Sequence, residues 1–137
     1  MSEWSGTASK EEKVQESPYK GKTGLKRVWN ALLYSLDGIK AALRYEDAFR
    51  QEMLLALALI PLAFYLERAA VGRVLMIGSV LLVLIVELLN SAVEAAVDRI
   101  SFEHHHLIKR AKDMGSAAVL ISLVNVVATW AVLLLDR

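Results

Sequence analysis

Apolar residues gather in four stretches of the chain, and their spacing predicts four helices. In residues 25–45 they recur every three or four positions, with basic and polar residues on the other faces, which predicts an amphipathic helix. The stretches at about 49–66, 74–97 and 114–135 are almost wholly apolar, as membrane-crossing helices are. The pattern therefore predicts an all-α membrane protein, with three transmembrane helices after an N-terminal amphipathic surface helix.

The composition favours the same class of protein. Of the 137 residues, 55% are hydrophobic, and the mean hydropathy is +0.40. This length predicts a single integral-membrane domain, at residues 25–137. Residues 1–24 are polar and mixed in charge, so we expect a disordered cytoplasmic tail and not a signal peptide. Cysteine is absent, which excludes disulfides and thiolate metal sites and leaves carboxylates and histidines as metal ligands.

Basic residues are distributed unevenly around the predicted spans. Nine Lys and Arg occur up to Arg50, two in residues 67–73, four in residues 98–113 and one at the C-terminus. Cytoplasmic segments of membrane proteins carry the excess of basic residues. The N-terminus and the second loop are therefore predicted to be cytoplasmic, and the C-terminus to lie outside.

Five polar residues interrupt the second apolar span: Glu87, Asn90, Ser91, Glu94 and Asp98. Their offsets of 0, 3, 4, 7 and 11 residues place them on one face of a helix. An ionisable group at membrane depth costs at least ~2.5 kcal/mol and usually marks a functional site. This polar stripe indicates chemistry or ion handling, with polar contacts between helices as the alternative. Small residues nearby predict an oligomer that shelters the stripe.

The acidic residues divide by depth. Glu87 has apolar neighbours on both sides, which suits a general base or a proton carrier. Glu94 lies closer to the predicted cytoplasmic side, and Glu46 precedes the first span at a similar depth. Carboxylates from two helices, together with phosphate oxygens, form a typical site for Mg²⁺. We expect Arg50 and Glu52 to extend from the first span to the membrane interface.

Residues 103–116 are predicted to form a cytoplasmic loop. Its basic side chains, among them Lys109 and Lys112, could bind phosphate, and Asp113 could accept a hydrogen bond or cap the third span. Three adjacent histidines cannot all face one ion, so the run His104–His106 favours nucleotide or lipid-headgroup contact over a transition-metal site.

Three motifs together resemble those of the prokaryotic diacylglycerol kinases. They are ELLNSAVEAAVDR at 87–99, RAKDMGSAAVL at 110–120 and YEDAFRQE at 45–52, and the resemblance runs from about Thr23 to the C-terminus. It implies a homotrimeric helical bundle in the bacterial inner membrane, with active sites shared between protomers. The implied reaction transfers the γ-phosphate of Mg·ATP to the hydroxyl of 1,2-diacylglycerol, giving phosphatidic acid. Mg²⁺ is the implied cofactor, and no nucleic-acid partner is expected.

The resemblance also implies roles for individual residues. Glu87 matches the catalytic base, Asn90 the polar residue that supports the catalytic site, and Glu46 and Glu94 the metal ligands. The matches to nucleotide-binding positions are Arg27, Tyr34, Glu46, Glu94, Glu103, His104, His105, Lys112 and Asp113. The matches to lipid-contacting positions are Arg27, Ser35, Phe49, Arg50, Gln51, Glu87 and Ser116.

Three other functions are compatible with the same pattern. A related undecaprenol kinase would share the core motifs and phosphorylate a polyprenol. A small proton- or cation-conducting oligomer would use Glu87 and Glu94 as its pathway. A membrane assembly protein would use the stripe only for contacts between helices. The ion-conducting oligomer leaves Glu46, Lys112 and Asp113 unexplained.

Overall fold

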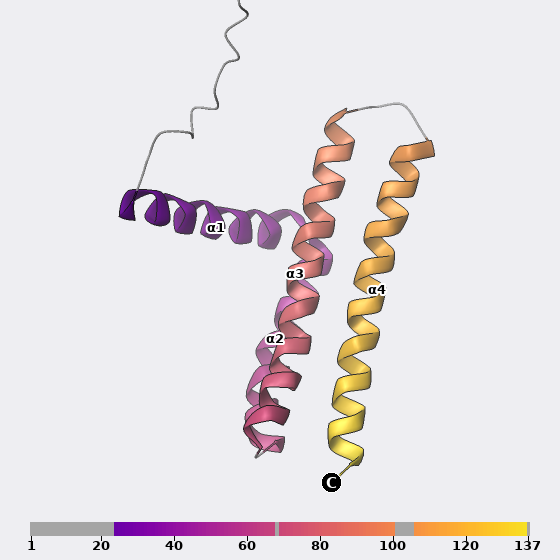
Figure 1. The fold of residues 1–137 in the computed structure, drawn as a ribbon. Helices are drawn as coiled ribbons and strands as arrows, with labels where there is room; N and C mark the ends of the chain where they lie inside the picture. The colour runs from indigo at the N-terminus through magenta and orange to yellow at the C-terminus, as the bar shows by residue number, and fades with distance from the viewer. Residues whose placement is uncertain (1–23, 68, 101–105, 137) are drawn as a thin grey trace, which may run out of the picture. The chain divides into compact units, whose positions relative to one another are not determined.

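The computed structural model of the chain describes residues 24–67, 69–100 and 106–136. These residues form four helices, in agreement with the all-α prediction (Figure 1). The helices in chain order are α1 (Leu25–Tyr45), α2 (Asp47–Leu66), α3 (Ala70–Ile100) and α4 (His106–Leu135).

Three of the helices are long and apolar enough to cross a membrane, which confirms the predicted number of spans. They cover 20 residues in α2, 30 in α3 (Ala70–Arg99) and 30 in α4. A helix of 30 residues is about 45 Å long, whereas the hydrocarbon layer is about 30 Å thick. Helices α3 and α4 can therefore extend beyond the hydrocarbon at the end where the polar residues lie.

The prediction of a loop at residues 103–116 is wrong from His106 onward, because α4 begins there. The first turns of α4 consist mostly of Leu, Lys, Arg and Ala, which are good helix formers. Their polar character reflects a helix that leaves the apolar layer, and not a loop. Asp113 lies inside α4 and does not cap it.

The chain divides into two compact units, residues 1–34 and 35–137. In the first unit, the described residues form the start of α1. Gly24 precedes the helix with φ of 78°, a backbone conformation that glycine adopts without strain. Its carbonyl oxygen accepts hydrogen bonds from the backbone N–H groups of Arg27 and Val28.

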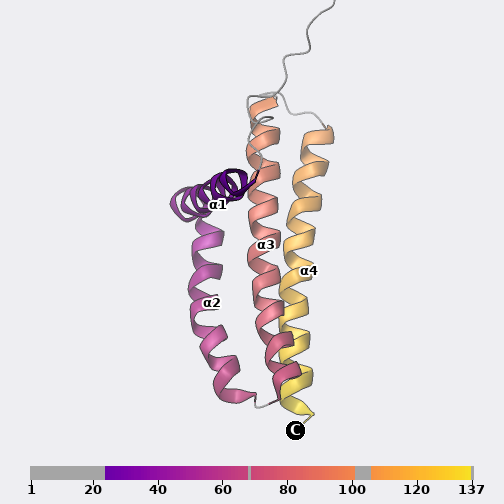
Figure 2. The same cartoon turned by 60° about the vertical axis from the view of Figure 1, so that its left-hand side comes forward.

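In the second unit, α3 packs against both α2 and α4 (Figure 2). The buried cluster consists of Ala56 and Ala63 from α2, Met76 and Val80 from α3, and Trp130 from α4. The two alanines have short side chains, which allow α2 to approach α3 closely. Many large apolar side chains of the spans remain exposed, as expected of surfaces that face lipid.

Three buried polar side chains in the spans find hydrogen-bond partners on the backbone. The Trp130 indole N–H donates a hydrogen bond to the carbonyl of Met76, across from α4 to α3, at 3.3 Å. The hydroxyls of Ser79 and Ser122 donate at 2.7 Å to the carbonyls of Met76 and Val119, each on its own helix. Such local bonds satisfy polar groups where no water is present.

The junction of α1 and α2 is held by Arg50. Its guanidinium donates to the backbone carbonyls of Leu43 and Arg44 at 3.2 and 3.3 Å and also pairs with Asp47. The last carbonyls of a helix lack partners within it, so Arg50 caps the end of α1. Glu46 occupies the junction in an extended conformation, and its side chain makes no capping bond.

We expect Ala63→Leu to destabilise the packing of α2 on α3. Ala63 is fully buried, so a larger side chain must displace its neighbours, and overpacking of this kind costs about 1–3 kcal/mol. The measurement is the unfolding temperature in detergent micelles. Ala58→Leu adds the same atoms at an exposed position of α2 and should leave this temperature nearly unchanged. An equal decrease in both variants would contradict the packing described above.

Candidate active site

The polar stripe runs along α3 with decreasing burial. Glu87 is buried, with 5% of its surface exposed. Asn90, Ser91 and Glu94 are half-buried, and Asp98 is exposed. This gradient fits a stripe that begins within the apolar layer and ends at its polar edge.

Carboxylates from three elements interact electrostatically with Glu87. Glu94 on α3, Glu46 at the junction of α1 and α2, and Glu52 on α2 lie near enough for their charges to interact with that of Glu87. The charges of three other carboxylates therefore act on or are acted on by that of the buried Glu87, and mutual repulsion of this kind favours binding of a proton.

Glu52 was expected to extend to the membrane interface, and the structure shows it packed partly against the protein. Its side chain is half-buried, and its Oε2 atom has no hydrogen-bond partner among the described residues. One feature of the sequence could have indicated a buried position for Glu52: it is the last charged residue before an apolar run of α2. Only the packing of α2 on α3 brings it near Glu87.

The amide of Asn90 is held between two helices. Its Nδ2 atom donates to Oε1 of Glu94 at 3.5 Å, which leaves Oδ1 directed the other way, since a carboxylate only accepts. Oδ1 is buried, has no hydrogen-bond partner among the described residues, and lies against Gly115 of α4. A Cβ atom at position 115 would overlap Oδ1, so this arrangement requires glycine there.

The polar edge of the site is formed by α3 and α4 together. Nζ of Lys112 on α4 lies 2.7 Å from Oδ1 of Asp98 on α3, and its charge also interacts with that of Glu94. The positive charge of Lys112 therefore acts on Glu94, the metal ligand expected from the sequence. Asp113 and Ser116, on the same helix, are exposed.

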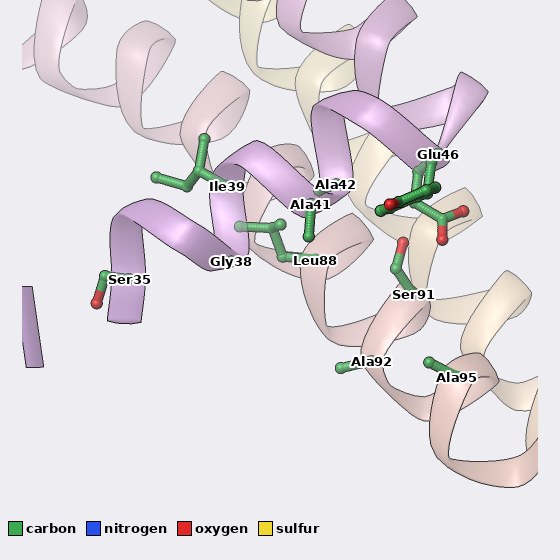
Figure 3. Close-up of a pocket in the computed structure, with 11 residues that line it drawn as sticks. Ser35, Gly38, Ile39, Ala41, Ala42, Glu46, Leu88, Ser91, Ala92 and Ala95 are labelled. Atoms are coloured by element: carbon green, nitrogen blue, oxygen red, sulfur yellow. The ribbon is translucent and has the colours of Figure 1, made fainter. Parts of the chain in front are cut away.

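An apolar groove of about 710 Å³ opens beside the stripe (Figure 3). The end of α1 forms one wall, including Gly38 and Ala42, and α3 forms the other, including Ala92. Figure 3 shows the side chains of Ser91 and Glu46 at the same end of the groove. The groove thus has mostly apolar walls, with these two polar side chains in its lining.

The other residues predicted to contact lipid have different environments. Ser35 lines the groove. Phe49 is buried, with 1% of its surface exposed, and Gln51 is exposed. Arg50 caps the end of α1, a role that the sequence analysis did not foresee.

The remaining predicted nucleotide contacts belong to the first unit or lie outside the described residues. Arg27 and Tyr34 are exposed side chains of the first unit. Three further positions lie outside the described residues: Glu103, His104 and His105.

The donor set of the site suits magnesium held jointly with phosphates. No group of three or more His, Cys, Asp or Glu side chains within residues 24–67, 69–100 and 106–136 could hold a metal ion. Mg²⁺ is commonly bound by one or two carboxylates, water and substrate phosphates, and not by a complete protein cage. Glu46 and Glu94 fit that chemistry.

The helices and their buried acidic site define a multi-span membrane protein with the elements of an enzyme active site. Comparison with known proteins gives the family. A sequence model described as prokaryotic diacylglycerol kinase matches residues 33–134. This range includes Glu46, Glu87, Asn90 and Glu94. The chain belongs to the prokaryotic diacylglycerol kinase family, which confirms the resemblance of its motifs.

Individual relatives match most of the chain. A diacylglycerol kinase of Pseudomonas aeruginosa is 59% identical over 122 residues, which are 89% of this chain and 99% of the relative. A diacylglycerol kinase of Escherichia coli is 54% identical over 112 residues, or 82% and 92% of the two chains. One of Haemophilus influenzae is 54% identical over 108 residues, or 79% and 92%.

We expect Gly115→Ala to displace Asn90 from Glu94, because the new methyl group would overlap Oδ1 of Asn90. The Asn90 side chain can rotate, so the unfolding temperature should change little. Kinase activity should fall about 10- to 100-fold, which is typical when a site group moves by ~1 Å. The matched control is Gly78→Ala on α3, where an added Cβ meets nothing within 4 Å. Equal activity of the two variants would contradict the role of Gly115.

Proposed function

We propose that the chain transfers the γ-phosphoryl group of ATP to the hydroxyl of 1,2-diacylglycerol, giving phosphatidic acid and ADP. Membership of the diacylglycerol kinase family supports the reaction. The structural observation that carries the mechanism is Glu87, a buried carboxylate on a membrane-spanning helix with other carboxylates near it. Few residues of this kind occur in membrane spans without a function.

The acceptor lipid would lie with its hydroxyl at the polar part of the groove. Diacylglycerol combines two acyl chains with a single hydroxyl, and the groove combines apolar walls with Ser91 and Glu46. We assign Ser35, Phe49, Arg50, Gln51, Ser116 and Arg27 to the lipid-contacting region from the family resemblance, and Ser35 is supported further by its place in the groove wall.

Glu87 would act as the general base. Its carboxylate accepts the proton of the lipid hydroxyl, and the hydroxyl oxygen forms a bond to the γ-phosphorus. The bond from that phosphorus to the bridging oxygen breaks, and its electron pair leaves with ADP. Asn90 supports the site through its bond to Glu94. Phosphoryl transfer depends mainly on such positioning and on charge stabilisation.

Glu46 and Glu94 would hold Mg²⁺, which neutralises charge on the nucleotide phosphates when it is bound. Lys112 and Asp113 would contact the nucleotide, and Lys112 supplies a positive charge beside Glu94. By resemblance, the further nucleotide contacts are Arg27, Tyr34, Glu103, His104 and His105.

The proposed assembly is a homotrimer in the bacterial inner membrane, with the N-terminus cytoplasmic and active sites shared between protomers. The distribution of basic residues supports the orientation. Two buried side-chain oxygens, Oε2 of Glu52 and Oδ1 of Asn90, have no partner among the described residues. Groups of this kind usually gain partners from a neighbouring molecule or from water. Nothing in the site favours a nucleic-acid partner.

The alternative functions are less favoured. The relatives named above are all diacylglycerol kinases, which favours diacylglycerol over a polyprenol as the acceptor. A proton- or cation-conducting oligomer would have no use for Lys112 beside Glu94 or for Glu46 at the groove. A purely structural stripe does not account for a buried Glu87.

The direct test is phosphorylation of diacylglycerol by the purified chain in mixed micelles with Mg·ATP. We expect Glu87→Gln to lower kcat by about 10²- to 10⁴-fold, the usual contribution of a general base, with an unchanged unfolding temperature. Glu67→Gln makes the same substitution at the end of α2 and should retain full activity.

Failure of the folded wild type to phosphorylate diacylglycerol would refute the proposal. Faster phosphorylation of undecaprenol than of diacylglycerol would replace it with the polyprenol kinase. Unchanged turnover in Glu87→Gln would remove Glu87 as the base.

Removal of divalent metal tests the roles of Glu46 and Glu94. We expect EDTA to abolish activity and added Mg²⁺ to restore it. Glu94→Gln should raise the Mg²⁺ concentration for half-maximal activity by about tenfold or more, since the loss of groups that support a metal site has effects of this size. Glu67→Gln again serves as the control. An unchanged Mg²⁺ requirement in both Glu46→Gln and Glu94→Gln would exclude these residues as ligands.

A further inference from the structure

Asp98 is the one residue of the polar stripe to which the proposed reaction gives no role. Its carboxylate contacts the ammonium of Lys112 at 2.7 Å and so links the end of α3 to the start of α4. The pairs Asp37–Lys40 and Asp47–Arg50 differ from it, because each joins residues three apart on one helix.

Stability alone is a weak explanation for this contact. The side chain of Asp98 is 63% exposed and that of Lys112 is 38% exposed. Ion pairs so accessible to water contribute little to folding free energy. The position of the pair, near Glu94 on α3, indicates its role better than its contribution to stability does.

The pair holds Lys112 beside the proposed metal site. Asp98 follows Glu94 by four residues on α3, hence by about one helical turn, and the charges of both act on Lys112. A free lysine side chain has many rotamers, and ordering it on binding a ligand costs entropy. Asp98 restricts those rotamers before the nucleotide arrives.

We propose that Asp98 is a positioning residue, which holds the Lys112 ammonium ready for the phosphates of Mg·ATP. This inference rests on the proposed function, because it assumes that Lys112 contacts the nucleotide. An ammonium group has three N–H donors. One donor suffices for Asp98 and two remain for phosphate oxygens, so Asp98 need not be displaced when the nucleotide binds.

The test compares the full-length variants Asp98→Asn and Asp98→Glu with the wild type. We expect Asp98→Asn to raise the KM for Mg·ATP about three- to tenfold, with kcat within about twofold and the KM for diacylglycerol unchanged. Asp98→Glu retains the charge and should restore most of the affinity. Asp37→Asn removes the acid of an exposed pair on α1 and should change none of these values.

A double variant tests whether Asp98 acts through Lys112. In a Lys112→Gln background, Asp98→Asn should cause no further increase in the KM for Mg·ATP. A full additional increase would show that Asp98 acts independently and would overturn the inference.

Two further outcomes of the single variant would also overturn the inference. A lower KM for Mg·ATP in Asp98→Asn would mean that Asp98 competes with the nucleotide for Lys112. A lower unfolding temperature with an unchanged KM would leave Asp98 with a structural role only.

A separate measurement distinguishes failure of the inference from failure of the proposed function. If the wild type does not phosphorylate diacylglycerol, the proposed function fails, and direct titration of Mg·ATP onto the protein decides the inference. A Kd raised about three- to tenfold by Asp98→Asn, and restored by Asp98→Glu, supports it. An unchanged Kd, or absence of nucleotide binding by the wild type, overturns it.

Discussion

The absence of water within the bilayer is the constraint on which this structure depends. A polar group in a membrane span must find a partner inside the protein. Ser79, Ser122 and Trp130 do so through hydrogen bonds to backbone carbonyls. Glu87 is different, because it is buried and the charges that act on it are those of two other carboxylates, Glu94 and Glu46. Mutual repulsion of such carboxylates favours uptake of a proton, and the proposed role of Glu87 as general base would use this property.

Helix α3 connects the parts of the site because it packs against both of the other spans. Its packing on α2 brings Glu52 near Glu87, and its packing on α4 brings Gly115 to Asn90 and Lys112 to Asp98. Small side chains permit these close approaches, among them Ala63 in the core. The same contacts that stabilise the bundle therefore also position the polar groups of the stripe.

The groove and the polar edge suit the two substrates of the proposed lipid kinase reaction. A water-insoluble acceptor can approach along apolar walls, and its hydroxyl then meets the polar groups at Glu46 and Ser91. A nucleotide is water-soluble and would approach from the polar edge, where Lys112 lies. Under the proposed function, the depth gradient along α3 would keep two substrates of opposite solubility apart until their reacting groups meet near Glu87.

The sequence by itself determined the four helices, the three spans and the polar stripe, because each follows from local periodicity and from the cost of charge in lipid. The motifs also determined the family. Only the tertiary structure decided that Glu52 turns inward, that Gly115 makes room for Asn90, and that Asp98 holds Lys112. These contacts join residues on different helices, and spacing along one helix carries no information about its neighbours. The early start of α4 at His106 was missed for a related reason: once a helix leaves the bilayer its residues become polar, and the apolar pattern no longer marks its end.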